Sequence, residues 1–270
     1  MSKNGQSLKD VLRSGFASMA ILIALVVSII VYFYVMGNPI NFEGGNPKGL
    51  PMPGNYLAMI YKGGMIVPLL MTCLLVVIIV SIERFITISR AKGKGRLNVF
   101  LKTLRGYLAA NQLDEAIQTC DKQRGSLANV MRAGLGKYKE LLNDQTIVKD
   151  QKVLALQKEL EESTALELPM LSKNLVILST LASISVLIGL IGTVLGMIRA
   201  FAALAQAGSP DALALATGIS EALINTAFGI SSSTLAIIFY NFFSSKIDAL
   251  TFKIDEAGFT VVQTFASQAK

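Results

Sequence analysis

The chain has 270 residues, of which 52% are hydrophobic and only 16% are charged, against about 25% charged residues in a typical globular protein. The mean hydropathy of +0.54 argues against a disordered or disulfide-stapled protein, and against reading the net charge of +7 as a sign of nucleic-acid binding. The absence of His excludes His-dependent metal sites, Ser-His-Asp triads and Cys-His dyads. Cys73 lies in an apolar run and Cys120 in a charged segment, so we interpret both as packing residues.

Stretches without charged residues locate the membrane spans, because a bilayer core about 30 Å thick needs about 20 apolar residues in a helix. Four such stretches occur along the chain. They lie between Arg13 and Glu43, between Lys62 and Glu83, between Lys173 and Arg199, and between Asp211 and Lys246, the last interrupted by Glu221. We therefore predict an all-α, polytopic membrane protein with four transmembrane helices and a helical cytoplasmic domain.

The first span follows Lys3, Lys9 and Arg13 and in this respect is similar to a signal peptide. Its apolar run from Phe16 to Met36 is long for a signal peptide, and no A-x-A cleavage site closes it. We interpret this segment as an uncleaved signal anchor.

Lys and Arg are distributed very unevenly over the connecting segments. Sixteen of the 25 lie in residues 84–173, and each tail holds three more. By the positive-inside rule, both tails and this long middle segment are cytoplasmic. The predicted order is a cytoplasmic tail (1–14), an extra N-terminal transmembrane helix (15–36), a periplasmic loop (37–62), a transmembrane helix (63–83), the cytoplasmic helical domain (84–173), a transmembrane helix (174–203), a periplasmic loop (204–214), a transmembrane helix (215–245) and a cytoplasmic tail (246–270).

Apolar residues recur at spacings of three and four from Leu97 to Leu168, which predicts amphipathic helices in the cytoplasmic domain. Gly125 and Asn143 predict breaks between them, and Pro169 predicts a kink or a helix boundary before the third span. The basic stretch Lys92–Arg96 superficially resembles a phosphate loop but lacks the G-x-x-x-x-G-K-[ST] spacing. We interpret it as a juxtamembrane linker that touches anionic lipid at the cytoplasmic face.

Small residues form a ridge along the third span at steps of three and four. The ridge comprises Ala182, Ser185, Gly189, Gly192, Thr193, Gly196 and Ala200. Such a ridge lets helix backbones approach closely, and Gly192-x-x-x-Gly196 is its tightest element. Taken alone, the pattern is typical of ordinary helix association inside one chain.

Glu221 is the only formal charge well inside an apolar stretch, and an ionisable group at mid-bilayer costs about 2.5 to 3.5 kcal/mol on translocon scales. It either snorkels to the nearby outer end of the span or faces water, a partner or an ion pathway. At 100° per residue, small and polar residues gather on one face of this span. They are Glu221, Asn225, Gly229, Ser232 and Ala236, with Thr226 and Ser233 at the edge. Because one carboxylate without His makes a poor relay, we expect a second polypeptide to supply the titrating group.

Two motifs resemble the MotA/TolQ/ExbB proton-channel family, most closely its ExbB/TolQ branch. They are Gly189-Leu-Ile-Gly-Thr-Val-Leu-Gly196, followed by Met-Ile-Arg-Ala-Phe201, and Gly218-Ile-Ser-Glu-Ala-Leu-Ile-Asn-Thr-Ala-Phe-Gly229, with Tyr240-Asn241 closing the fourth span. The resemblance implies a homopentamer in the bacterial inner membrane, whose pore helices, 174–203 and 215–245, surround two copies of a single-pass ExbD- or TolR-like partner with a transmembrane Asp. It further implies a motor that uses the proton-motive force for TonB-type outer-membrane transport or envelope maintenance, with a TonB-like or TolA-like protein as a further partner and no cofactor.

Matched position by position, Thr193 and Thr226 correspond to the family's pore threonines beside the partner's Asp, and Glu221 to its pore glutamate. Together with the polar face, the resemblance assigns these roles. The ion pathway comprises Thr193, Thr226, Glu221, Asn225, Ser232 and Ser233, and the packing residues are Gly189, Gly192, Gly196 and Gly229. Arg199 stands where the family has a neutral polar residue, and it either pairs with Glu221 at the outer mouth or contacts the partner.

The sequence departs from the family pattern at Val186, Thr217 and Leu235, where prolines are expected, which puts helix kinks there in doubt. The first span is extra relative to the three-span ExbB/TolQ plan. Four spans match the MotA plan, so a MotA-like stator driving a flagellar or gliding machine is the alternative. A solute transporter would show inverted repeats with broken helices, a scaffold leaves the polar face unexplained, and an enzyme lacks a nucleophile-base constellation.

Overall fold

The computed structural model describes residues 8–47, 49–144, 146–205 and 211–268, so the segments predicted at 1–14, 204–214 and 246–270 fall partly outside it. Within these residues the chain forms helices, and Phe42 and Pro51 make an isolated β-bridge. Four helical segments of the described chain are long and apolar enough to cross a membrane. They are Ser18–Met36, Gly64–Ala91, Lys149–Leu204 and Ala212–Gln268. The predicted all-α membrane class with four spans is confirmed.

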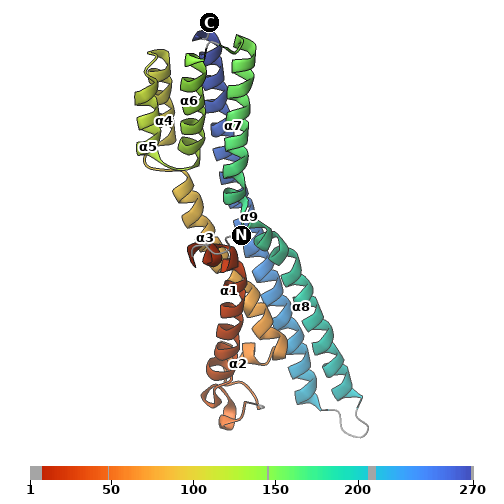
Figure 1. Ribbon diagram of the computed structural model, residues 1–270. Coiled ribbons are helices and arrows are strands. Elements are labelled where there is room, and N and C mark those ends of the chain that lie inside the picture. Colours follow the sequence, from red (N-terminus) through yellow and green to blue (C-terminus); the bar gives the residue numbers. More distant parts are fainter. Residues whose placement is uncertain (1–7, 48, 145, 206–210, 269–270) are drawn as a thin grey trace, which may run out of the picture. The chain divides into compact units, whose positions relative to one another are not determined.

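The chain divides into two compact units, each assembled from segments distant in sequence (Figure 1). The first, here called the span unit, comprises residues 1–82 and 176–240, and the second, the bundle unit, comprises residues 83–175 and 241–270. Helices α3 (Val67–Ala91) and α9 (Ala212–Gln268) contribute residues to both units.

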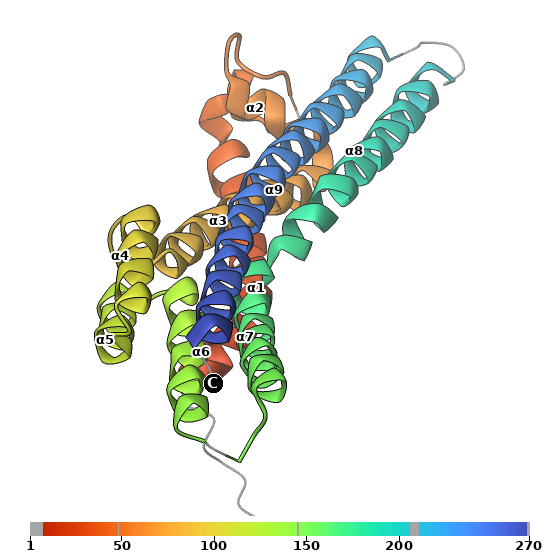
Figure 2. The same ribbon diagram turned by 90° about the horizontal axis from the view of Figure 1, so that it is seen from above.

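The span unit contains α1 (Leu8–Ile30), the first part of α3, α8 (Leu175–Leu204) and the first part of α9. Helices α8 and α9 lie side by side in both views (Figures 1 and 2). Val186 lies inside α8, and Thr217 and Leu235 lie inside α9, so both helices continue through the positions where prolines were expected.

Asparagines organise the segment between α1 and α3. The helix α1 leads into a π-helical turn, Val31–Met36, whose last carbonyls accept hydrogen bonds from Asn41 Nδ2 at 2.8 Å and 3.1 Å. Asn55 caps the short α2 (Tyr56–Tyr61) by accepting from two of its first backbone amides. Such side chains satisfy backbone groups that helix ends leave without partners.

The first span is packed into the core of the span unit. Tyr32 and Met36 of the π-helical turn form a buried cluster with Val67, the first residue of α3. Partly buried apolar side chains pack against this cluster, among them Ile224 of α9. The Tyr32 hydroxyl also donates to the carbonyl of Tyr61 at 3.0 Å, and the two rings stack.

The bundle unit contains α4 (Leu97–Ala109), α5 (Leu113–Gln123), α6 (Ser126–Asn143), α7 (Lys149–Ser172) and the end of α9. In Figures 1 and 2, α6 and α7 flank the end of α9. The predicted apolar stripes form its core, and α6 begins after Gly125 and ends at Asn143, where breaks were predicted. The Tyr138 ring packs edge-on against Phe265, and its hydroxyl donates to Gln268 Oε1 at 2.7 Å.

Pro169, which the sequence predicted to mark a kink or a helix boundary, precedes the end of α7 by three residues. It lies inside α7, whose last turn continues to Ser172, and the Pro169 carbonyl still accepts from Lys173 N at 3.0 Å. The chain turns instead at Asn174, which adopts a left-handed backbone with φ of 66°. Because Asn tolerates this conformation and its side chain donates to Glu83 Oε2 at 3.2 Å, tertiary contact places the boundary beyond the proline.

Candidate functional site

Glycines allow α8 and α9 to touch backbone to backbone. A side-chain carbon added at Gly196 would lie 2.7 Å from the Ala222 nitrogen and 2.8 Å from the Gly218 oxygen. One added at Gly189 would lie 3.1 Å from the Gly229 Cα. Larger residues would push the helices apart, so the small-residue ridge of α8 is the surface that receives α9 of the same chain.

The polar face of α9 points into this contact and towards the start of α3. Gly192 of α8 lies against the side chain of Asn225, which is fully buried. Asn225 Nδ2 donates to the carbonyl of Gly63 at 2.8 Å. Asn225 Oδ1 has no hydrogen-bond partner among the described residues, and burying an amide oxygen in this way costs about 1 to 3 kcal/mol.

Arg199 and Glu221 form an ion pair that joins α8 to α9. Only 6% of the Glu221 side chain is exposed, whereas 57% of the Arg199 side chain is. Gly64, with φ of 76°, lies directly against the carboxylate and leaves no room for a Cβ atom. The structure thus shows Arg199 paired with Glu221, and a contact between Arg199 and a partner chain stays a prediction.

Thr193 and Thr226 meet at the edge of the helix contact. Their hydroxyls hydrogen-bond to each other. The Thr193 hydroxyl also lies 3.1 Å from the carbonyl of Gly189, and the Thr226 hydroxyl 3.1 Å from that of Ala222. Both residues are partly buried, whereas Glu221 and Asn225 of the same polar face are buried.

Other predicted pathway residues are more deeply buried. Ser232 is fully buried, and the hydroxyl of Ser233 donates to the carbonyl of Ala182. Within one chain, the face that was expected to line a pore or meet a neighbouring helix is covered by α8 and by the residues just before α3. The glycine ridge is the physical reason, because it brings the α8 backbone onto that face.

The sequence did not predict that Gly63 would contact Asn225 or that Gly64 would contact Glu221. The pair was interpreted only as the beginning of the second span. Their proximity to Asn225 and Glu221 depends on a contact between helices far apart in the sequence, and adjacent glycines were the only local signal.

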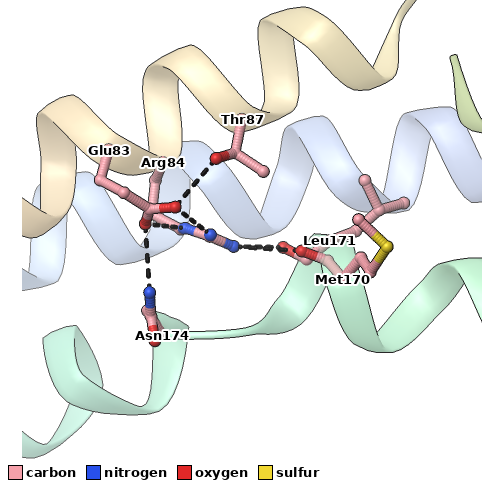
Figure 3. A network of polar contacts seen from close by, with 6 residues as sticks. All are labelled: Glu83, Arg84, Thr87, Met170, Leu171 and Asn174. Atoms are coloured by element: carbon pink, nitrogen blue, oxygen red, sulfur yellow. Dashed lines mark hydrogen bonds and ion pairs between the residues drawn. The ribbon is translucent and has the colours of Figure 1, made fainter. Parts of the chain in front are cut away.

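A second polar cluster lies in the bundle unit and centres on Arg84, whose side chain is only 2% exposed (Figure 3). Its guanidinium donates to the Glu83 carboxylate at 2.5 Å and 2.6 Å and to the Leu171 carbonyl at 3.0 Å. Glu83 also accepts hydrogen bonds from Thr87 and Asn174. Because the last carbonyls of a helix lack helical partners, this network closes the end of α7. In the sequence, Glu83 and Arg84 marked only the edge of a predicted span.

The two cysteines are buried and unpaired with each other. Burial raises the pKa of the Cys120 thiol to about 12, which keeps it protonated and unreactive at neutral pH. No cluster of three or more His, Cys, Asp or Glu that would hold a metal ion occurs in the described part of the chain.

The sequence matches the MotA/TolQ/ExbB proton channel family over residues 122–256, which is half of the chain and includes α8 and the part of α9 that contacts it. The chain belongs to this family.

Relatives of the chain include proteins named TolQ and ExbB. The chain is 31% identical over 121 residues to the Tol-Pal system protein TolQ of Pseudomonas aeruginosa, a match that covers 45% of this chain and 52% of that protein. It is 38% identical over 97 residues to TolQ of Haemophilus influenzae, covering 36% and 39%. It is 39% identical over 70 residues to the biopolymer transport protein ExbB of Salmonella typhimurium, covering 26% and 29%. The chain thus spans about half the length or less of these curated relatives.

Proposed function

We propose that the protein is the pore-forming subunit of an ExbB/TolQ-like motor in the bacterial inner membrane. Ion flow through its complex with an ExbD- or TolR-like partner energises TonB-type outer-membrane transport or envelope maintenance. Membership of a proton channel family and the likeness to TolQ and ExbB support this function. The observation that carries it is the hydrogen bond between the hydroxyls of Thr193 and Thr226, two partly buried residues on adjacent helices of the apolar span unit.

Hydroxyls suit this role because each can donate and accept a hydrogen bond without becoming charged. The partner supplies a transmembrane Asp that titrates beside Thr193 and Thr226, and water bridges the carboxyl group to the hydroxyls. The ion pair of Arg199 and Glu221 forms the outer mouth of the pathway, and Asn225, Ser232 and Ser233 support its wall. Each proton that crosses 100 mV releases about 2.3 kcal/mol, so appreciable work requires several protons.

The assembly is a homopentamer around two copies of the partner, with a TonB-like or TolA-like protein as a further component. Apolar side chains that are exposed along α8 offer surfaces for lipid or for neighbouring copies. They include Leu187, Leu190, Ile191, Val194 and Ile198. The excess of Lys and Arg in residues 84–173 supports a cytoplasmic location for this segment and both termini. The predicted segments, from the anchor at 15–36 to the pore helices at 174–203 and 215–245, then follow one another across the inner membrane.

A MotA-like stator acting on a flagellar or gliding machine is the second candidate. One observation favours it, namely that the first span belongs to the core through Tyr32 and Met36. Four integral spans match the MotA plan. The neighbouring reading frame tests the choice, because a short partner with one N-terminal span containing Asp fits either candidate, whereas a peptidoglycan-binding domain on that partner favours the stator.

Thr226→Val tests the pore role directly. The variant removes the hydroxyl and keeps the shape, so proton-motive-force-dependent uptake and proton flux in vesicles should fall at least about tenfold, as expected when one hydrogen bond worth about 1.4 kcal/mol is lost along the pathway. The number of subunits per complex, measured by native mass spectrometry, should stay unchanged.

Thr180→Val is the matched control, because the exposed Thr180 donates only to the carbonyl of Val176 in its own helix. Its flux should equal that of the unaltered protein. Normal uptake in Thr226→Val would refute the pore role of the hydroxyl pair.

A further inference from the structure

A pocket of about 510 Å³ opens beside the last turns of α3 within the bundle unit. It is lined by Phe85, Ile86, Ser89, Arg90, Gly93, Lys94 and Arg124. Its three cationic residues are exposed, and none of the ion pairs within the described residues involves them. The pocket therefore presents three positive charges that the described chain does not neutralise.

The two loops that carry Lys94 and Arg124 contact each other. The amide of Lys94 donates to the carbonyl of Gln123 at 2.7 Å, and Gln123 Nε2 donates to the carbonyl of Lys92 at 3.4 Å. Gly93 and Gly125 have φ of 75° and 91°. A Cβ atom at Gly125 would lie 2.6 Å from the Gly93 nitrogen. Only glycine permits this approach, which positions the basic loop of residues 92–96 against residues 123–125.

Arg124 adopts a backbone conformation that residues with side chains rarely take. Its φ is 56° and its ψ is 173°, and conformations of this kind persist only where the surrounding structure enforces them. The residue stands between the Gln123 carbonyl and Gly125, which make the contacts with the opposite loop. The same contacts that strain Arg124 therefore bring it to the pocket that Arg90 and Lys94 line.

The wall of the pocket on α3 is apolar at one end and cationic at the other. Phe85 is 60% exposed and Ile86 is 45% exposed. Ser89 lies four residues after Phe85, and Arg90 lies four residues after Ile86. Each pair therefore shares a helix face, with the second residue about 6 Å further along the axis. Because α3 belongs to a segment apolar enough to span a membrane, this order matches a molecule with a hydrocarbon tail and an anionic head.

We propose that this pocket binds one anionic phospholipid per chain. Arg90, Lys94 and Arg124 hold the phosphate, and Phe85 and Ile86 contact the first part of an acyl chain. The proposal rests on the proposed function, which places residues 84–173 at the cytoplasmic face of the membrane. The sequence predicted only that the basic linker touches anionic lipid, and the pocket specifies which residues bind it. Free phosphate offers the cations the same chemistry, but it leaves the exposed apolar wall unused.

Native mass spectrometry of the purified full-length protein tests the site. The protein is reconstituted with phosphatidylglycerol or with phosphatidylcholine, and the lipid retained per chain is counted. The double variant Lys94→Gln/Arg124→Gln should retain at least about tenfold less phosphatidylglycerol, because each basic residue near an anionic lipid contributes roughly fivefold. Lys102→Gln/Lys122→Gln removes two exposed charges that do not line the pocket, and retention should stay unchanged. Equal losses in the two double variants would overturn the site.

Competition separates lipid from free phosphate. Inorganic phosphate and glycerol phosphate, at millimolar concentration, should leave phosphatidylglycerol in place, and displacement by either would overturn the proposal that a lipid is bound. Phe85→Ser should weaken retention of phosphatidylglycerol, and unchanged retention would argue against the acyl contact. The count requires neither a partner nor ion flow, so Thr226→Val should bind lipid normally. Failure of the lipid site and failure of the pore function are thereby distinguishable.

Discussion

Glu221 and Arg199 share one ion pair but meet solvent very differently. The carboxylate is buried and the guanidinium is more than half exposed. A buried charge that loses its partner is costly, whereas an exposed one is rehydrated. The pair therefore stabilises the carboxylate far more than the arginine.

Arg199→Ala should lower the melting temperature of the purified protein and alter its ion flux. We expect a cost of about 1 to 2 kcal/mol, less than the 3 to 5 kcal/mol of a wholly buried pair because water screens the exposed arginine. Adding Glu221→Gln removes the unpaired charge, so the double variant should regain part of the melting temperature. A double variant no more stable than Arg199→Ala would show that loss of the ion pair does not cause the drop in melting temperature. Unchanged ion flux in the single and the double variant would leave the pair with a structural role alone.

At the residue scale, the sequence pointed to the two charged residues of the ion pair but not to the residues that surround them. Arg199 and Glu221 stood out because each is a lone charge near an apolar stretch. Gly64 did not, because its role depends on a left-handed backbone and on a carboxylate contributed by a different helix. Arg84 was missed for a similar reason, since nothing local marks an arginine at a span edge as buried.

At the scale of elements, the contact between α8 and α9 rests on shape. Their glycines and alanines leave no space for added atoms. The periodic spacing of small residues predicted this contact, because backbones approach only where side chains are small. The end of α7 was not predictable in the same way, since the network around Arg84 and Asn174 displaces it beyond Pro169.

Two glycine substitutions should act in opposite directions. Gly196→Ala places a methyl group against the backbone of α9 and should lower the melting temperature by a few degrees, as overpacking by about 1 to 3 kcal/mol predicts. Gly106→Ala lies on α4, where nothing stands within 4 Å of the added carbon, and it should be neutral or stabilising by up to about 1 kcal/mol. Thermal unfolding in one detergent checks both. Equal shifts would contradict the claim that α8 and α9 are in closest contact.

At the scale of the whole molecule, the predicted topology has a chemical test that uses the buried thiols. Cys73 and Cys120 are buried, and the pKa of Cys120 is raised to about 12, so background labelling should be low. A membrane-impermeant maleimide added to spheroplasts should label Tyr56→Cys, at a position that is 77% exposed in the predicted periplasmic segment. It should reach Leu154→Cys, at a position 64% exposed in the predicted cytoplasmic domain, only after permeabilisation. The reverse pattern would invert the topology.

Hydropathy predicted the number of spans, but it gave the first span no role beyond anchoring. The structure packs Tyr32 and Met36 against the start of α3 and close to Ile224 of α9. A pattern of apolar residues shows that a segment can cross a membrane, and it does not show which neighbours the segment will touch. The first span consequently packs against α9, the helix that carries Glu221, Asn225 and Thr226.

The hydrogen-bond chain through the hydroxyls of Thr193 and Thr226 can run in either of two directions. Two hydroxyl protons serve the bond between the threonines and the carbonyls of Gly189 and Ala222. One arrangement runs from Thr193 through Thr226 to the Ala222 carbonyl, and the other runs in reverse to the Gly189 carbonyl. Interconversion needs only the rotation of the two hydroxyl hydrogens. The direction of the hydrogen-bond chain can thus reverse while every heavy atom keeps its position.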